Sequence, residues 1–229
     1  MQAVLINHMG SDITVVNSAR VSFLKESKWD DDGETDYTST SLGHAPLSEV
    51  DQKLINYLAK HNHYTPFTHV MITMREKVPI FVARQRFKHT VGFSYNEVSR
   101  RYVDTPPEFY VPDVWRGKPI NAKQGSSDEV VKKNDLIHQD YKEFLGRATL
   151  EYQSMLDEGV APEQARIVLP QSLFTEYYCT GSLAAWARAY KLRSDRHAQK
   201  EIQELAKQWD QMISNISELK YSWSALTHE

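Results

Sequence analysis

Residues 67–87, FTHVMITMREKVPIFVARQRF, change their hydrophobic period halfway along. Apolar side chains at positions 70, 72, 74 and 78 alternate with polar ones at 73, 75 and 77. This period of two predicts a half-buried strand over 67–78. Pro79 suits the first turn of a helix, because its missing N–H would have no partner there anyway. Residues 80–87 are therefore expected to form a short, largely buried helix directly after the strand.

The flanking sequence predicts mostly helices. Apolar residues three or four apart indicate helices over 48–61, 129–157 and 202–216, and Gly159 and Pro162 mark the end of the second and the start of another. Residues 11–24 mix β-forming residues with polar ones and favour early strands. Polar stretches with Gly or Pro predict loops at 29–43, at 92–107, where the loop leads to a strand, and at 116–128. We expect an α+β fold in a single domain, residues 1–229, with an antiparallel or mixed sheet flanked by helices and long helices in the C-terminal half.

Composition limits the kinds of ligand. The 229 residues carry a net charge of −3, so the chain as a whole is no polycation for nucleic acid or an anionic membrane. Any anionic ligand must therefore be met by local groups of arginine. The one cysteine, Cys179, excludes an intrachain disulfide framework and a thiolate zinc site. No apolar run approaches the roughly 20 residues of a membrane span, and residues 1–8 are too short for a signal peptide, so we expect a cytoplasmic protein.

Two groups of cationic residues stand out. The first is interleaved with aromatic residues, and guanidinium groups among buried aromatics usually have an anionic partner. In the second, Arg166 precedes an apolar segment and is expected away from the open surface. From charge alone, the first group is better interpreted as a solvated basic face. Any single residue of the second group is better interpreted as an ordinary salt-bridge partner. Together they suggest a ligand with several phosphates. The first group is Arg84, Arg86, Lys88, Arg100 and Arg101, and the second is Arg166, Arg188, Arg193 and His197.

Other chemistries have weaker support. His61, His63 and His69 offer imidazoles, but no helical His-x-x-x-His pair or carboxylate triad accompanies them, so we predict no metal site. The sequence neighbours of Cys179 offer neither a base nor a cation, so this cysteine is expected in the core rather than as a nucleophile. The sequence has no glycine-rich phosphate loop, and a nucleotide would have to be bound by side chains.

Three blocks of sequence carry a resemblance to a known family. Residues 63–69, HYTPFTH, are similar to its His-x-Thr-Pro-Phe-x-His pattern. Residues 79–102 end in NEVSRRY, and residues 165–170, ARIVLP, are followed by matching residues within 192–199. Together the blocks resemble the flavin-dependent thymidylate synthases, in a form like those of phages, over most of the chain.

The signature of that family, Arg-His-Arg followed by seven residues and Ser, is altered here. Arg84-Gln85-Arg86 leads after seven residues to Ser94, and Lys88-His89-Thr90 leads after eight to Ser99. We favour the second register, because Ser99 then lies in the family's Asn-Glu-x-Ser-x-Arg-Tyr context. This register keeps one of the two cations of the motif and adds one residue before the serine.

The resemblance implies reductive methylation of dUMP to dTMP. FAD would carry the hydride, methylenetetrahydrofolate would donate the carbon and NADPH would reduce the flavin, so no enzyme nucleophile is required. Arg193 would be the catalytic residue and would stabilise negative charge on the pyrimidine as N3 ionises. The family further implies a homotetramer with shared active sites, no required nucleic acid or membrane partner, and the host cytoplasm as location if the chain is phage-encoded.

The site residues carry over position by position. Ser99 is assigned to binding rather than attack, because no base accompanies its hydroxyl. The resemblance implies dUMP contacts from Gln85, Arg86, Phe87, Lys88, Glu97, Val98, Ser99, Arg100, Arg101, Arg166 and Arg193. It implies FAD contacts from His63, Thr65, Lys88, His89, Thr90, Glu97, Ser182, Arg188 and His197.

Two other classes of function stay open at the level of sequence. A metal-dependent nucleotide hydrolase would use the histidines and would be colourless. A non-catalytic RNA- or nucleotide-binding module would use the same arginines and aromatics. Its affinity would fall steeply with salt, and it would show no turnover.

Overall fold

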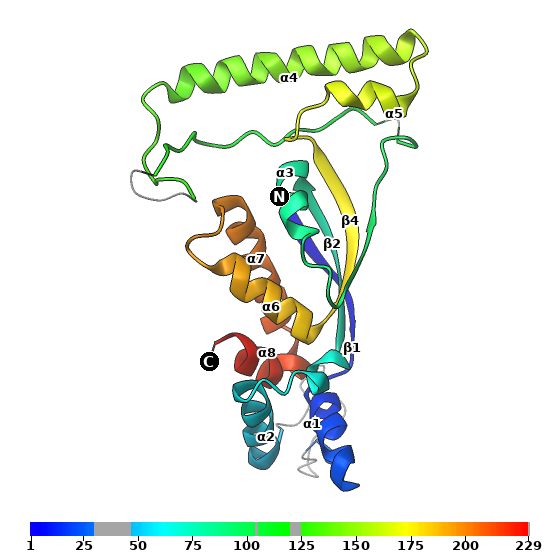
Figure 1. Ribbon diagram of the computed structural model, residues 1–229, viewed down its shortest axis with the longest axis vertical. Helices are drawn as coiled ribbons and strands as arrows, with labels where there is room; N and C mark the ends of the chain where they lie inside the picture. The colour runs from blue at the N-terminus through cyan, green and yellow to red at the C-terminus, as the bar shows by residue number, and fades with distance from the viewer. Residues whose placement is uncertain (30–46, 104, 120–124, 229) are drawn as a thin grey trace, which may run out of the picture.

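A four-stranded antiparallel sheet lies at the centre of the computed structural model, which describes residues 1–29, 47–103, 105–119 and 125–228 (Figure 1). The strand order is β1-β2-β4-β3, and each neighbouring pair is antiparallel. The central strands β2 and β4 pair from Met71 with Ser182 to Pro79 with Phe174, so the sheet joins the first half of the chain to its last third. The strands are β1 (Gln2–Met9), β2 (Met71–Pro79), β3 (Phe93–Glu97) and β4 (Phe174–Ser182).

The predicted strand is confirmed as β2, although it begins at Met71 rather than residue 67. Ile72, Met74 and Val78 are fully buried, as the period of two predicts. The residues before the strand form a 3₁₀ turn, η2 (Thr65–Thr68), which has a proline in its first positions. Glu76 occupies the same inward phase as the apolar residues, so a carboxylate is buried in the core face of the strand.

Helices follow both central strands and cover one face of the sheet. In Figure 1, α6 and α7 lie beside the sheet, α1 and α2 lie at the end where β2 begins, and α4 and α5 lie at the opposite end. The helices are α1 (Asp12–Arg20), α2 (Glu49–Lys60), α3 (Ile80–Arg86), α4 (Asn134–Asp157), α5 (Pro162–Ala165), α6 (Leu183–Ser194), α7 (Lys200–Ser214) and α8 (Lys220–Thr227). Short 3₁₀ turns η1 (Val21–Phe23), η3 (Arg166–Val168) and η4 (Ser217–Leu219) complete the described elements.

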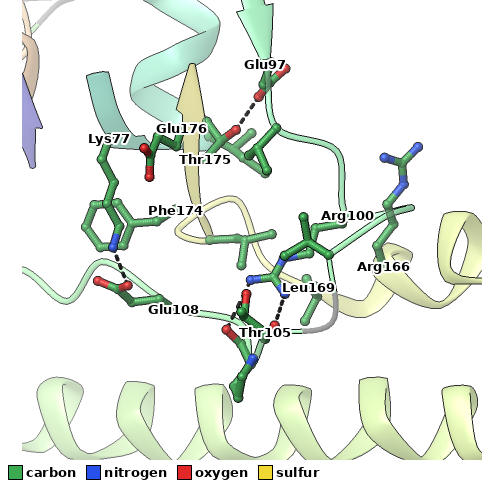
Figure 2. Close-up of a pocket in the computed structure, with 15 residues that line it drawn as sticks. Lys77, Glu97, Arg100, Thr105, Glu108, Arg166, Leu169, Phe174, Thr175 and Glu176 are labelled. Carbon is green, nitrogen blue, oxygen red and sulfur yellow. Dashed lines mark hydrogen bonds and ion pairs between the residues drawn. The ribbon is translucent and has the colours of Figure 1, made fainter. Parts of the chain in front are cut away.

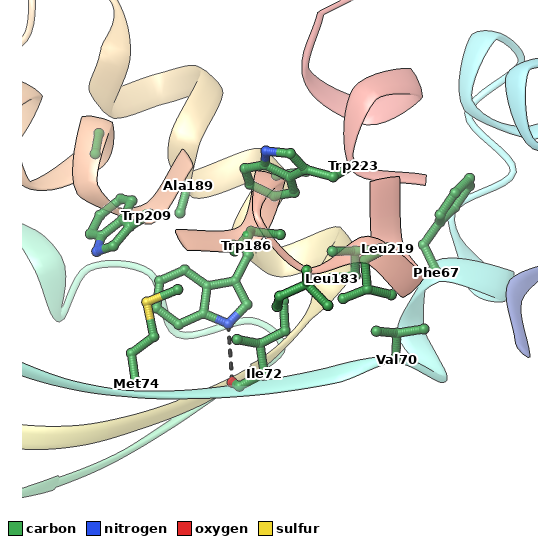
Figure 3. Close-up of a cluster of buried hydrophobic side chains, with 14 of the residues drawn as sticks. Phe67, Val70, Ile72, Met74, Leu183, Trp186, Ala189, Trp209, Leu219 and Trp223 are labelled. Carbon is green, nitrogen blue, oxygen red and sulfur yellow. Dashed lines mark hydrogen bonds between the residues drawn. The ribbon is translucent and has the colours of Figure 1, made fainter. Parts of the chain in front are cut away.

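Three tryptophans form the centre of the core between the sheet and the C-terminal helices (Figure 3). The rings of Trp186 on α6 and Trp209 on α7 meet edge to face, with their centroids 5.5 Å apart. The indole nitrogen of Trp186 donates a hydrogen bond of 3.2 Å to the carbonyl of Ile72 on β2. Trp223 of α8 closes the same cluster. This packing fixes α6 against the sheet, and α6 carries two of the cationic residues singled out in the sequence.

Helix α4 is covered by its own chain on only part of its surface. Leu145, Ala148 and Tyr152 are buried, as the helical period predicts. Leu136 and Leu150 are 53% and 72% exposed, although both are large and apolar. The amphipathic pattern of α4 therefore predicts that more of its apolar surface is buried than the described residues of one chain cover.

The fold class is confirmed, with a sheet that is antiparallel rather than mixed. The helices expected at 48–61, 80–87, 129–157, 202–216 and after Pro162 are present within a few residues of their predicted bounds. The preference for strand over 11–24 was wrong. Ser11 forms a capping box with Thr14, and Val15 and Val16 are buried, so capping and packing outweigh β propensity in α1.

The remaining differences concern loops and strands. The predicted loop over 92–107 contains β3, and the loop over 29–43 lies outside the described residues except for its first position. The sequence did not predict β1, β4 or α8. None of the described helices is both long and apolar enough to cross a membrane.

Candidate active site

The end of α3 and the exposed side of α6 bring together four of the predicted site residues, here called the Arg193 cluster: Gln85, His89, Arg188 and Arg193. Arg193 Nε donates to His89 Nε2 at 2.9 Å, and Arg193 Nη2 donates to the carbonyl of Gln85 at 3.2 Å. Arg188 Nη2 donates to the carbonyl of Val91. These bonds attach α6 to the turn between α3 and β3.

The electrostatics of the cluster keep its histidine neutral. Burial lowers the pKa of His89, and the guanidinium groups of Arg86, Arg193 and Arg188 lower it further, to about 4. Arginine can only donate, so His89 Nε2 is the acceptor and the ring proton lies on Nδ1. Burial also lowers the pKa of Arg193, and repulsion from Arg86 lowers it further by a smaller amount. Within the described residues, two of the five N–H groups of Arg193 have hydrogen-bond partners.

Gly92 allows the turn after α3 to pack closely on the start of α6. Its φ is +79°, and a Cβ there would lie 2.9 Å from Ala185 Cβ and 3.2 Å from Ser182 Oγ. Ser182 is only 6% exposed, and its hydroxyl accepts from the backbone N–H of Ala185 as the N-cap of α6. The hydroxyl of Ser182, an implied FAD contact, is therefore buried and caps a helix, and the contact itself stays a prediction.

Arg86, an implied dUMP contact, lies in the core of the chain. Its side chain is 0% exposed and lies 3.2 Å from the buried carboxylate of Glu76. The anion expected beside this guanidinium among aromatics is thus a residue of the protein, and Arg86 is not available to a ligand. The sequence signal for this pair is Glu76 itself, a carboxylate in the inward phase of a strand.

A cavity of about 370 Å³, here called the loop pocket, collects a second set of predicted residues: Glu97, Val98, Arg100 and Arg166 (Figure 2). Thr175 Oγ1 donates to Glu97 at 2.5 Å. Arg100 donates to the backbone carbonyls of Thr105 and Pro106, so its guanidinium holds the loop rather than projecting freely. In Figure 2 the guanidinium of Arg166 points away from the other labelled side chains. Arg166 is exposed, so the expectation that it avoids the open surface was wrong.

A third set lies in a cavity of about 560 Å³ between α1, α2 and η2, here called the helical pocket. His63 and Thr65 line it on the polar side, and Phe23, Leu54 and Tyr57 supply apolar walls. Arg20 also lines this cavity, but its guanidinium is paired with the buried Asp51 at 2.5 Å. The size of the helical pocket and its mixed polar and apolar lining are typical of sites that bind a ring system.

The other predicted residues lie on exposed or half-buried turns. Lys88 and Thr90 are exposed beside the Arg193 cluster, and the Phe87 ring packs on Tyr95 and Tyr177. Ser99 Oγ accepts from Arg101 Nε at 3.2 Å on the loop after β3. His197 is exposed and lies 2.9 Å from Asp195, and Gln199 accepts from Gln85 at 2.5 Å.

Cys179 is buried, as predicted, but it does have a cation nearby in space. Arg86 Nη2 lies 2.9 Å from its Sγ, a contact that the sequence neighbours of the cysteine do not reveal. Burial outweighs that cation and raises the pKa of the thiol to about 12. Among the described residues, no three His, Cys, Asp or Glu side chains gather closely enough to hold a metal ion.

One chain does not bring all of these residues to one place. The loop pocket includes Lys77 near one end of β2, whereas the helical pocket includes η2 and His69, just before the other end. At about 3.3 Å per residue, the strand between them spans roughly 20 Å. The predicted residues therefore form three surface regions of the chain rather than one cavity.

Comparison with known proteins gives these regions a context. Residues 4–217 match the family of the thymidylate synthase complementing protein. The flavin-dependent thymidylate synthase of Thermosipho africanus is 38% identical, with 96% of this chain and 87% of the relative covered. That of Thermotoga neapolitana is 36% identical, with 88% and 80% covered. The crystal structure of a UMP/dUMP methylase, PolB from Streptomyces cacaoi, bound with 5-Br dUMP is similar with a TM-score of 0.80 and 28% identity, covering 98% of this chain and 93% of that one.

Proposed function

Because the chain belongs to the thymidylate synthase complementing protein family, we propose that it methylates dUMP to dTMP with FAD as hydride carrier. Methylenetetrahydrofolate is the proposed carbon donor and NADPH the proposed reductant. The observation that carries the proposal is the hydrogen bond between Arg193 and His89, which are 104 residues apart in the sequence. They come from two of the three blocks that resemble the family, and they meet at the accessible side of α6.

The charge of Arg193 suits the anion that the reaction develops. A carboxylate beside this guanidinium would cancel its charge, whereas the neutral imidazole of His89 accepts one N–H and leaves the charge in place. The guanidinium is half-buried, so its attraction for an ionising pyrimidine is stronger than in open water. Arg193 then orients the uracil ring and stabilises its negative charge.

The donor set fits a flavin dinucleotide. The helical pocket offers apolar walls for a ring, with His63 and Thr65 as polar contacts. Lys88, Thr90 and Arg188 offer exposed cations and a hydroxyl to a diphosphate, and His197 is exposed as well. When bound, FAD supplies hydride transfer, which no side chain can perform.

The nucleotide is assigned to residues that remain accessible. Gln85, Lys88 and Arg193 at the end of α3 and on α6 are proposed to hold its base and phosphate. The loop after β3 and η3 complete the proposed site, whereas Arg86 is buried and Arg100 holds its own loop. The proposed loop contacts are Glu97, Val98, Ser99, Arg101 and Arg166, and Phe87 packs on Tyr95 and Tyr177.

We propose a homotetramer in which several copies complete each site. The separation of the loop pocket from the helical pocket supports this arrangement, because neither region alone offers both base and diphosphate contacts. Four large apolar side chains on one side of α4 are exposed and support it as well, since such a group is typical of contact surfaces: Leu136, Ile137, Phe144 and Leu150.

The visible absorbance spectrum of the purified protein tests the flavin assignment, with any chromophore released by heat and identified. We expect near-stoichiometric FAD, either as purified or after FAD is added back to a colourless preparation. A protein that fails to bind added FAD would contradict the proposal. A nucleotide hydrolase would stay colourless under both conditions.

A further inference from the structure

A chain of buried polar contacts runs from the core to the underside of the Arg193 cluster. We propose that Tyr95, anchored by the buried Glu76–Arg86 pair, is a positioning residue that fixes the Lys88-His89-Thr90 turn through the carbonyl of His89. This inference deepens the proposed function, because that turn carries the altered signature motif and contacts assigned to both ligands.

The hydroxyl of Tyr95 has a defined direction. Arg86 Nη1 donates to it at 2.6 Å, and the hydroxyl lies 2.8 Å from the carbonyl of His89 and 3.2 Å from that of Arg86. A hydroxyl carries one hydrogen, and Arg86 can only donate, so that hydrogen points to one of the two carbonyls or to Cys179 Sγ, and sulfur is the weakest acceptor of the three. The shorter distance selects His89. A donor that is itself hydrogen-bonded to a cation is polarised, which strengthens its bond to the turn.

Arg86 forms a rigid anchor for this bond. Its guanidinium is fully buried, pairs with Glu76, and lies 4.4 to 5.2 Å from the ring centroids of Phe93, Tyr95, Trp186 and Trp209. Replacing a buried ion pair by apolar residues of similar volume is often neutral or stabilising, so such a pair is weak support for a role in stability alone. Its contact with Tyr95 gives it a second role, that of fixing a turn at the proposed site.

The same contacts act on the side chain of His89. The carbonyl held by Tyr95 and the imidazole held by Arg193 belong to one residue, so fixing the backbone also fixes the acceptor of Arg193. Arg86 is moreover among the cations that lower the pKa of His89. The register of the sheet places Tyr95 opposite Cys179, and the hydroxyl of Tyr95 lies 2.8 Å from the carbonyl of the turn.

Tyr177 supplies a matched control. Its hydroxyl donates to Glu76 Oε2 at 2.6 Å in the same buried network. No hydrogen bond from that hydroxyl to the turn is among those of the described residues. Tyr177→Phe and Tyr95→Phe each remove one buried hydroxyl and keep the ring, so both test the loss of one hydrogen bond from the Glu76–Arg86 network. Only Tyr95→Phe removes the hydrogen bond to the carbonyl of His89.

The test compares both variants in the full chain. We expect similar losses of thermal stability, but faster hydrogen exchange of the amides at 88–90 and shifted His89 imidazole resonances only in Tyr95→Phe. FAD and dUMP affinity should fall roughly five- to tenfold in Tyr95→Phe, the scale of one buried hydrogen bond, and stay near wild type in Tyr177→Phe. Equal amide exchange and equal His89 resonances in the two variants would overturn the inference.

The two proposals can fail separately. Amide exchange and imidazole resonances are measured without ligand, so they test Tyr95 even if wild-type protein binds no flavin. Normal exchange in Tyr95→Phe together with normal flavin-dependent turnover in the wild type would overturn the positioning role alone.

Discussion

His89 remains uncharged beside three arginines. Burial and the guanidinium groups of Arg86, Arg193 and Arg188 give it a pKa of about 4, so at neutral pH its ring is an acceptor. The positive charge of Arg193 therefore stays available to a ligand. The sequence could suggest Arg193 through the family resemblance, but it could not show that a neutral imidazole is its partner, because the two residues meet only in the folded chain.

Removing Arg193 tests its assigned role. We expect Arg193→Ala to lower the rate of dTMP formation by roughly 10²- to 10³-fold, as for loss of one preorganised charge at a reacting anion. FAD should stay bound, as read from its visible spectrum in the same samples. Arg196→Ala removes the same charge from an exposed neighbour and should leave turnover near wild type. Near-normal turnover in Arg193→Ala would remove the catalytic role from this residue.

The neutral state of His89 also predicts a dependence of stability on pH. Its pKa is about 4 in the folded protein and about 6.5 in an unfolded chain. Between these values the unfolded chain binds a proton at this position that the folded protein does not, so the contribution of His89 to the free energy of unfolding should fall as the pH falls from 6.5 to 4. Burial raises the pKa of Asp12 to about 6, so the contribution of Asp12 runs in the opposite direction, and the difference between wild type and a His89 variant isolates His89. His89→Gln keeps an acceptor for Arg193 and removes the titration, so it should weaken this dependence.

Urea denaturation at several pH values between 4 and 7 measures the effect. His61→Gln, a change at an exposed histidine, should keep the wild-type dependence. The same dependence in His89→Gln as in wild type would mean that His89 titrates normally in the folded protein.

At the scale of elements, the turn between α3 and β3 determines the shape of the Arg193 cluster. Gly92 lies in this turn with a positive φ and in close contact with α6. We expect Gly92→Ala to destabilise the protein by about 1–2 kcal/mol from backbone strain, and by a further 1–3 kcal/mol from crowding against Ala185. The turn should shift, and FAD affinity should fall with it.

Gly159→Ala separates the two causes. Gly159 also has a positive φ, but a Cβ there would meet nothing within 4 Å among the described residues. This variant should lose stability through strain only and bind FAD as the wild type does. Urea denaturation and FAD titration of both variants provide the comparison, and equal losses in both measurements would show that close packing at Gly92 is unimportant.

The elements with a strong hydrophobic period could be predicted from the sequence. β2, α2 and α7 follow the spacing of their apolar residues, and α4 does so in part. The others depend on what lies outside the local segment. β3 is an edge strand that, among the described residues, pairs with β4. Its burial alternates over 93–96, but this run is short and follows Gly92, so local sequence favoured a loop. The β-forming residues of α1 are accommodated by a capping box and by packing of its valines.

At the scale of the whole molecule, the predicted site residues of one chain lie in three separate regions, and we expect the site to draw on more than one chain. The sequence could name residues, but it could not show that one chain distributes them over three regions. Arg86 illustrates what the sequence could not show. A cation among aromatics predicted a ligand, whereas folding places Glu76 within reach and buries both.

Mixing two inactive variants tests the shared site. If Arg193 and His63 act in one site from different copies, refolding Arg193→Ala together with His63→Ala should restore about a quarter of wild-type turnover, the share of sites that random assembly leaves intact at both positions. Each variant refolded alone is the control and should remain nearly inactive. No recovery in mixed tetramers, confirmed as mixed by mass, would mean that one chain supplies both residues.

The conversion of dUMP to dTMP by the purified protein is the most direct test. The reaction is run with FAD, methylenetetrahydrofolate and NADPH, and the nucleotides are separated and identified by mass. We expect dTMP in the full mixture and none when FAD is omitted from stripped protein or when the folate is left out. Absence of dTMP from a protein that binds both FAD and dUMP would contradict the proposed reaction.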